Sequence, residues 1–414
     1  MSSIKPISKF EGKKIYFDNA ATSFPKPEPV LTAIDMYLRS CGNPGRGAHS
    51  YALAGARTIF DSREAIAAFL GIEPSERLIF TPGCTESINM VLKGLVLSGG
   101  LSGGDVVVTT SMEHNSVMRP LFQLQASPGI RVETVDFCVD PEVFADNLRI
   151  RLIETKARLC FLMRASNVTG ELLPIKQAAA VCNDLSVPLA VDAAQSAGKV
   201  EVDLSQSGIS YWCASGHKGL LGPPGIGLLY VAPGAPLSPI VTGGTGSSSE
   251  SYEVPETMPD RFEAGTQGGQ NIAGLAAACA WLKKRDAEAV LRHELNLTER
   301  FHVWAQSRRE NQADIEVFGP QSCYSDDKPR ILVKMPVVSF RLKGLSPALI
   351  AEKLDRDYGI AVRPGLHCAI AAHKRLVTDD TGLVRVSFGP FNSLIELERL
   401  ISALEEIMLD GSKQ

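Results

Sequence analysis

The sequence lacks the features of several large classes of protein. It has no apolar run of bilayer length and no basic, apolar, small-residue signal at its start, where residues 1–14 resemble a loose leader. Its 46 Asp and Glu residues outnumber 42 Lys and Arg, and the formal net charge is -4, whereas a nucleic-acid-binding surface is normally basic. We therefore predict no membrane association and no nucleic-acid partner.

Cysteine usage excludes a disulfide framework. The nine cysteines are odd in number and contain no Cys-x-x-Cys pair. Such a pattern is typical of reduced thiols in a cytoplasmic protein rather than of a secreted one. We expect most of them, such as Cys160 and Cys279, to be core residues, and we predict no metal site.

Apolar strands alternate with helices over the first part of the chain. This order predicts an α/β fold, with a mostly parallel sheet covered on both faces, and ligands bind such sheets beyond the carboxyl ends of the strands. The polar residues expected at these ends are His114, Asn167, Asp192 and Gln195. The strands are predicted over 77–80, 105–110, 132–137, 158–163 and 187–191, and the intervening helices over 88–97, 140–154 and 174–183.

A second domain follows a long segment rich in Gly, Ser, Glu and Pro, residues 239–259, which we expect to be a mobile or functional loop. We predict a large domain over 16–270. A smaller α+β domain is expected over 271–414, joined by residues 1–15.

The stretch Tyr211–Lys218 ends in a lysine that is followed by a glycine-rich turn. A lysine on such a loop can form an imine with a carbonyl group. Taken alone, Lys218 is more simply a solvated charge, Asp192 a cap, and His114 a core or surface histidine. The strand, glycine turn and helix around Thr85 can bind an anion, although a helix start of this kind is more often only an N-cap.

Together these residues have one chemical use. Pyridoxal phosphate (PLP) needs a lysine for its imine and a carboxylate that keeps its pyridine nitrogen protonated. It also needs a flat group against the ring and a cup of donors around the phosphate. The residues that can supply these functions are, in order, Lys218, Asp192, His114, and Thr85 with Ser215 and His217.

With these motifs the chain resembles the PLP-dependent enzymes of the aminotransferase class V group, in the branch of cysteine desulfurases and selenocysteine lyases. The resemblance spans about residue 16 to the last helix and implies fold type I, with a seven-stranded sheet in the large domain. It is carried by the segments 18–22, 83–86, 113–114, 166–170, 191–195, 215–218, 262–266, 363–369 and 385–387.

The resemblance also implies the roles of the cofactor-binding residues. Lys218 would form the imine and then move protons at the substrate carbon. Asp192 would pair with the pyridinium nitrogen, Gln195 would bind the ring oxygen, and His114 would stack on the ring. The phosphate would be held by Thr85, Cys84, Ser215 and His217, and by Thr266 of a partner subunit, which implies a homodimer.

The same resemblance predicts the reaction. Arg385, Asn167 and Arg363 would bind the substrate, and a planar guanidinium suits its carboxylate. Cys368 would attack the sulfur of L-cysteine, giving L-alanine and a persulfide for an acceptor protein. Attack requires the thiolate, which His367 and Arg363 could favour. Selenocysteine lyases and other class V β-lyases or aminotransferases share this frame and remain alternatives.

Three positions depart from the family pattern. Cys84 stands where related enzymes often carry Thr, and a thiol is the weaker donor. Leu366 stands where short-loop desulfurases, which the compact Arg363–Ala369 segment resembles, often have a second histidine. Arg164 adds a cation before Asn167 that can alter substrate choice.

Overall fold

The structure, a computed structural model, describes residues 12, 14–45, 47–247, 250–310, 315–325 and 331–411. The leader predicted over 1–14 lies almost wholly outside the described residues. The chain forms two compact units. The large unit comprises the described residues within Lys26–Arg164 and Leu173–Glu288, and the small unit comprises those within 1–25, 165–172 and 289–414.

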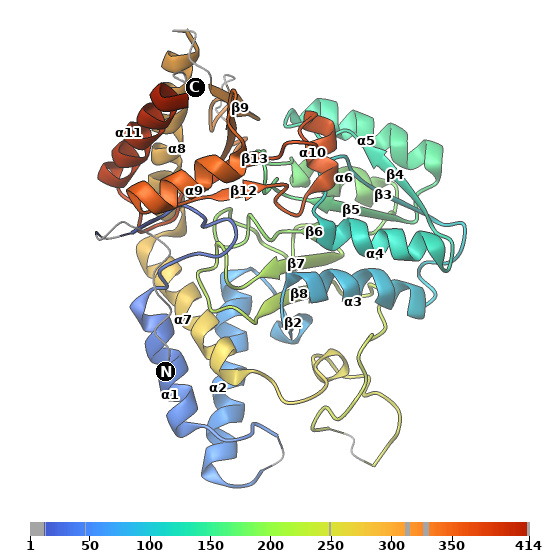
Figure 1. The fold of residues 1–414 in the computed structure, drawn as a ribbon. Coiled ribbons are helices and arrows are strands. Elements are labelled where there is room, and N and C mark those ends of the chain that lie inside the picture. The colour runs from blue at the N-terminus through green and yellow to red at the C-terminus, as the bar shows by residue number, and fades with distance from the viewer. Residues whose placement is uncertain are drawn as a thin grey trace. The chain divides into compact units, whose positions relative to one another are not determined.

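A seven-stranded sheet forms the centre of the large unit, as predicted (Figure 1). Its order is β2-β8-β7-β6-β5-β3-β4, and all neighbours pair in parallel except β8, which is antiparallel to β2 and β7. The strands are β2 (Leu78–Thr81), β3 (Val106–Thr110), β4 (Arg131–Val135), β5 (Leu159–Met163), β6 (Leu189–Asp192), β7 (Tyr211–Ser215) and β8 (Gly227–Val231).

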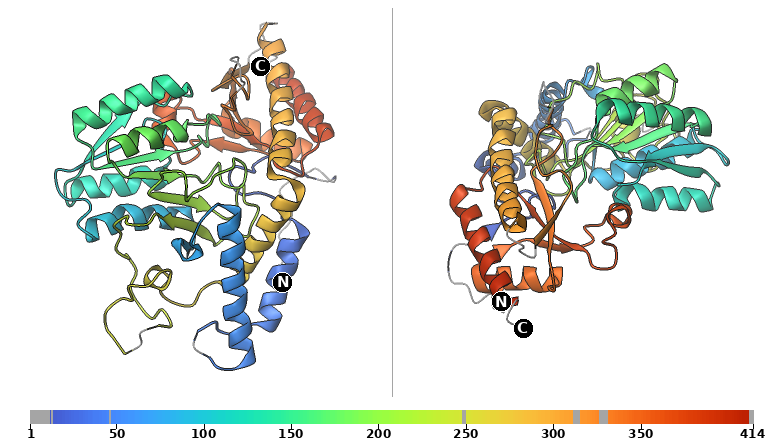
Figure 2. Two further views of the ribbon diagram at one scale, coloured as in Figure 1. Left: turned by 180° about the vertical axis from the view of Figure 1, so that it is seen from behind. Right: turned by 90° about the horizontal axis from the view of Figure 1, so that it is seen from above.

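Helices cover both faces of this sheet, and all strands except β4 are buried along their whole length (Figure 2). Residues buried on two faces must be apolar throughout, which explains runs such as Leu159–Met163. The helices are α1 (Glu28–Ser40), α2 (Ser50–Phe69), α3 (Cys84–Leu97), α4 (Asn115–Ala126), α5 (Pro141–Thr155), α6 (Ile175–Asp184) and α7 (Gly269–Arg285), with short 3-10 turns at Ser75–Arg77 and Asp260–Phe262.

Gly227 allows the turn before α3 to lie against the start of β8. A Cβ added there would stand 2.3 Å from the carbonyl carbon of Gly83, closer than any real contact. The close approach of the backbone at the start of α3 therefore depends on a glycine that lies 144 positions later in the chain.

The small unit is built on a four-stranded antiparallel sheet with the order β12-β13-β10-β9 and a parallel pair, β1 with β11. Its core includes Phe17, Phe301, Phe340 and Phe388. The elements are β1 (Ile15–Tyr16), α8 (Ala287–Glu310), β9 (Ile315–Phe318), β10 (Val337–Leu342), α9 (Pro347–Tyr358), β11 (Ile360–Ala361), β12 (Arg363–Gly365), α10 (Ile370–Leu376), β13 (Leu383–Ser387) and α11 (Leu394–Gly411).

Three details differ from the sequence-based expectations. The stretch 211–215, whose lysine we placed on a loop, is the fully buried strand β7, and the loop begins only after Ser215. Helix α4 was not anticipated, since it starts with polar residues and contains Pro120. The domain boundary was expected at 270/271. Helix α7 instead packs on α1 and α2 and belongs to the large unit, which ends at Glu288. No described helix is long and apolar enough to cross a bilayer.

Candidate active site

Asp192 ends the central strand β6, at the carboxyl edge of the parallel strands, where a ligand was expected. Its side chain is 5% exposed, and its Oδ1 accepts hydrogen bonds from Ala194 N at 2.9 Å and from the Cys84 thiol at 3.6 Å. Burial and the charge of Asp192 raise the pKa of Cys84, so this thiol is a neutral donor. Within the described part of the chain, Asp192 has no ion-pair partner.

The lysine predicted to hold the cofactor follows β7 and is half-buried. The charge of Lys218 acts on two neighbouring groups. It partly opposes the rise that burial causes in the pKa of Cys84, and it lowers the pKa of His217. Burial, then Lys218 and then Lys26 lower the pKa of His217 to about 4, so its imidazole is neutral. Lys218, Cys84 and Asp192 therefore lie at one edge of the sheet.

The first turn of α3 faces the same region. Its N-cap is Gly83, and no side chain caps the helix. The simpler interpretation of the segment around Thr85, in which it serves only as an N-cap, therefore does not apply to Thr85. Thr85 is exposed at the second helical position. A Cβ added at Gly83 would meet nothing within 4 Å, so there is open space beside backbone N–H groups that a helix start leaves unpaired.

His114 is the N-cap of α4, and its Nδ1 accepts the Ser116 backbone N–H at 3.1 Å. In the neutral ring the proton is then on Nε2. The preceding Glu113 is fully buried, and its Oε1 accepts from Thr110 Oγ1 and Met163 N, both at 2.8 Å. Burial raises the pKa of Glu113 to about 8, so this carboxyl group is protonated at neutral pH.

These residues fit the cofactor that the sequence predicts. A buried carboxylate without a cation is costly, and a protonated ring nitrogen would satisfy Asp192. The helix start at α3 and the hydroxyl of Ser215 offer donors suited to a phosphate. Buried Gln195, in the turn after β6, offers another donor. The donor set thus matches an aromatic cation that bears a phosphate.

The small unit brings together the residues predicted to bind the substrate. Arg385, on β13, is 2% exposed; its Nη2 donates to Asp18 Oδ1 at 2.7 Å and its Nη1 to the Asn167 carbonyl at 3.0 Å. Its Nε and the Oδ1 of Asn167 are buried without a hydrogen bond among the described residues. Arg363 Nη1 lies 3.7 Å from Asp18 Oδ2. Two guanidinium groups around one carboxylate leave a net positive cluster that can take a second carboxylate.

Cys368 is exposed on the turn that follows β12. Both His367 and Cys368 have positive φ, 51° and 55°, which costs a non-glycine residue about 1–2 kcal/mol each. The Asn167 side-chain amide donates to the His367 carbonyl at 2.8 Å and thereby supports this turn. Burial, followed by the charge of Arg385, lowers the pKa of His367 to about 3. A neutral His367 cannot supply the positive charge near Cys368 that the sequence suggested.

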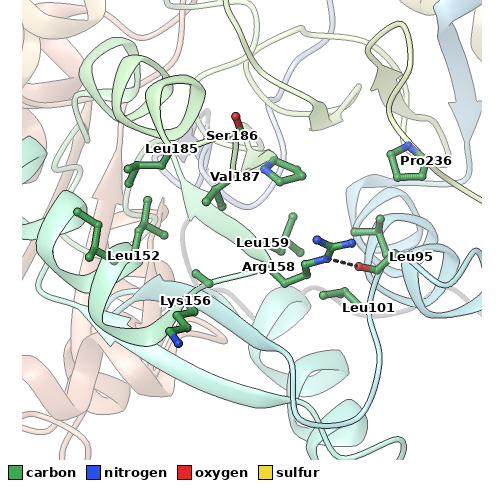
Figure 3. A pocket seen from close by; sticks show the side chains of 14 residues that line it. Leu95, Leu101, Leu152, Lys156, Arg158, Leu159, Leu185, Ser186, Val187 and Pro236 are labelled. Atoms are coloured by element: carbon green, nitrogen blue, oxygen red, sulfur yellow. Dashed lines mark hydrogen bonds between the residues drawn. The ribbon is translucent and has the colours of Figure 1, made fainter.

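Two cavities of the large unit lie apart from Asp192. Exposed Thr266 lines one of about 230 Å³ together with Pro82 and Glu86 at the start of α3. The other, of about 460 Å³, lies at the amino ends of β5 and β6, the edge opposite to Asp192, and is lined by Leu152, Leu185 and Arg158 among others (Figure 3). None of the predicted site residues lines this second cavity.

Two residues of these clusters were not assigned a role from the sequence. Lys26 donates to the His217 carbonyl at 2.9 Å, and burial lowers its pKa to about 8. It lies 191 positions before His217, so no local pattern could have identified it. Asp18 belongs to the segment 18–22 that carries the family resemblance, and this segment was the signal from which its role could have been predicted.

Arg164, one of the three departures from the family pattern, is half-buried, and burial lowers its pKa to about 10.

The parallel sheet, with a lysine and a buried carboxylate at its carboxyl edge, defines an α/β protein of the kind expected from the sequence. The aminotransferase class-V family model matches residues 15–400. A probable cysteine desulfurase from Methanothermobacter thermautotrophicus is 33% identical over 95% of this chain and 94% of its own. The chain therefore belongs to the aminotransferase class V family, as predicted, and the name of this relative falls within the predicted branch of cysteine desulfurases and selenocysteine lyases.

Solved structures agree with this family. The apo cysteine desulfurase from Thermococcus onnurineus NA1 superposes with a TM-score of 0.85 at 32% identity, covering 96% of this chain and 95% of its own. The cysteine desulfurase CsdA from Escherichia coli gives a TM-score of 0.80 at 27% identity, with the same coverage. The predicted fold is thereby confirmed.

Proposed function

We propose that this protein is a PLP-dependent cysteine desulfurase that converts L-cysteine to L-alanine and receives the sulfur on Cys368 as a persulfide. The observation that supports this most directly is the turn in the small unit, where exposed Cys368 follows His367. The pKa of His367 is lowered by burial and then by the charge of Arg385, which is itself buried and incompletely paired. Cysteine desulfurase names among relatives that match 95% of this chain support the same reaction.

Each residue would have one task. Asp192 would hold a proton on the ring nitrogen of the cofactor, and Lys218 would anchor the cofactor and move protons at the substrate carbons. Ser215, His217, Gln195 and the first turn of α3 would hold the remaining polar groups, with His114 against the ring. When bound, PLP would supply an electron sink for the substrate carbons.

Arg385, with Arg363 and the Asn167 amide, would bind the substrate carboxylate. Among the described residues, Arg385 uses two of its five N–H donors, which leaves three for a ligand. The Cys368 thiolate would attack the substrate sulfur: an S–S bond forms, the Cβ–S bond breaks, and its electron pair takes a proton at Cβ. The products are alanine and Cys368–S–SH.

The test measures alanine and protein-bound persulfide from L-cysteine, with PLP supplied. Cys368→Ala should lose the persulfide and reduce alanine formation at least tenfold, whereas the control Cys138→Ala, a half-buried thiol, should keep both. Full desulfurase activity of Cys368→Ala would refute the role of Cys368. Borohydride should link the cofactor to the Lys218 peptide in wild type, and the absence of that link would contradict the cofactor site.

The same assay with L-selenocysteine and L-cysteine sulfinate separates the alternatives. A selenocysteine lyase would prefer selenocysteine by orders of magnitude, and an aminotransferase would accumulate the keto acid instead of alanine.

We also propose a homodimer in which Thr266 serves the partner's phosphate site. Exposed apolar side chains on α1 and α2 are consistent with a covered surface: Leu31, Met36, Leu38, Tyr51, Leu53 and Phe60. A mixture of Lys218→Ala and Thr266→Ala subunits should recover activity if sites are shared, and no recovery would contradict this.

We infer a cytoplasmic location, because all nine cysteines are free thiols. We also infer that a thiol-bearing acceptor protein receives the sulfur.

A further inference from the structure

A chain of hydrogen bonds runs through the small unit behind Cys368. Thr378 Oγ1 lies 2.8 Å from His373 Nδ1, His373 Nε2 lies 3.3 Å from His367 Nδ1, and His367 Nε2 lies 3.1 Å from the Arg363 carbonyl. His373 and Thr378 are fully buried, and His367 is 5% exposed. The four groups form a continuous path from the end of α10 to the strand that leads into the Cys368 turn.

The direction of this chain follows from its last member. The Arg363 carbonyl can only accept, so His367 Nε2 must carry a proton. His367 Nδ1 is then an acceptor in the neutral ring, and His373 Nε2 must donate to it. His373 Nδ1 in turn accepts the Thr378 hydroxyl proton. Both rings are neutral: burial lowers the pKa of His367 to about 3 and also lowers the pKa of His373.

The chain holds the residue immediately before Cys368. The ring of His367 is fixed by His373 and by the Arg363 carbonyl, and its own carbonyl accepts from Asn167 at 2.8 Å. His367 and Cys368 both occupy the left-handed region of the backbone, which a free chain would leave. A conformation of this kind persists only where the surroundings hold it at several points.

We propose that His373, supported by Thr378, is a positioning residue for sulfur transfer: it fixes His367 in one tautomer and thereby holds the Cys368 turn. His373 is fully buried, so it acts through His367 and not on the substrate. The effect on sulfur transfer depends on the proposed function, whereas the effect on the turn does not.

The alternative is that His373 only fills space in the core, and matched variants distinguish the two roles. His373→Gln keeps an N–H donor near the Nε2 position, whereas His373→Met keeps the volume without a donor. His302→Met is the control, because His302 is also buried in the small unit and its ring nitrogens have no hydrogen bond among the described residues.

The experiment uses the full-length protein with PLP and has two readouts. The first is amide hydrogen exchange of peptides that cover 363–369, measured without substrate. The second is kcat and KM for persulfide and alanine formation from L-cysteine. Loss of one buried hydrogen bond corresponds to about tenfold in an equilibrium. His373→Met should therefore exchange about tenfold faster in this segment and lose about tenfold in kcat, with KM within about twofold of wild type.

His373→Gln should recover both readouts to within about threefold, and His302→Met should leave both unchanged. Equal impairment of the Met and Gln variants, or wild-type exchange in His373→Met, would overturn the proposal. If His373→Met does not fold, Thr378→Val serves instead, because it removes the hydroxyl at the first position of the hydrogen-bond chain at equal volume. It should give the same changes in weaker form, and wild-type values of both readouts in Thr378→Val would overturn the proposal. If wild type itself forms no alanine, the proposed function fails, and the exchange data alone decide the role of His373.

Discussion

Replacement of Glu113 by glutamine should remove a large pH dependence of stability. The Glu113 carboxyl group is fully buried and has no cationic partner among the described residues. Burial is the largest cause that raises its pKa from 4.5 to about 8, and hydrogen bonds from Met163 N and Thr110 only partly oppose it. The protein therefore binds a proton here that the unfolded chain has already lost at neutral pH.

The sign follows from linkage. A group whose pKa is raised in the folded state contributes stability that is complete below its unfolded value and is lost as the pH rises through the folded value. For Glu113 this window runs from 4.5 to about 8. At about 1.36 kcal/mol per pH unit, wild type should lose about 4 kcal/mol between pH 5 and pH 9 through this residue alone.

Glutamine has the same shape as the protonated acid and does not titrate. Glu113→Gln keeps an oxygen for Thr110 and Met163 and should therefore become more stable relative to wild type as the pH rises. The difference in free energy of unfolding between the two proteins, from urea unfolding at pH 5 to 9, should change by about 4 kcal/mol. Glu154→Gln, an exposed control on α5, should show almost no change. A pH-independent difference for Glu113→Gln would refute the reasoning, since Glu113 would then be ionised in the folded protein.

Two further predictions concern buried charges elsewhere. Arg63 donates to both carboxylate oxygens of Glu263 at 2.9 and 2.7 Å, so Arg63→Met should lower the free energy of unfolding by about 3–5 kcal/mol in urea at pH 7. The Arg63→Met, Glu263→Leu double variant should recover at least half of this lost stability, because it removes the carboxylate that Arg63→Met leaves buried without a partner. An equal loss in the single and the double variant would contradict this explanation. Burial lowers the pKa of Lys334 to about 8, so ionised Lys334 destabilises the fold below that pH. The stability of Lys334→Met relative to wild type should thus fall by roughly 2–3 kcal/mol from pH 7 to pH 10, and a constant difference would show that Lys334 is charged in the fold.

Strong local patterns accounted for most of the elements predicted from the sequence. Helix α9 begins after Ser346, whose side chain accepts from Leu349 N, and ends at Gly359 with φ 66°, so its limits are encoded locally. Strand β7 was missed because its aromatic and small residues precede a glycine-rich loop and have no alternation. Only the pairing with β6 and β8 makes it a strand.

The sequence by itself determined the family, the parallel sheet and the lysine and carboxylate at its edge, because these follow from short motifs and from apolar runs of characteristic length. The tertiary structure decided the state of the groups around them. Burial keeps Glu113 protonated and His367 neutral. Asp18, 367 positions away in the sequence, holds Arg385, and folding of the small unit brings the ring of His373 onto the ring of His367. Desolvation and hydrogen bonding depend on what folding brings close, and no local pattern in the chain records them.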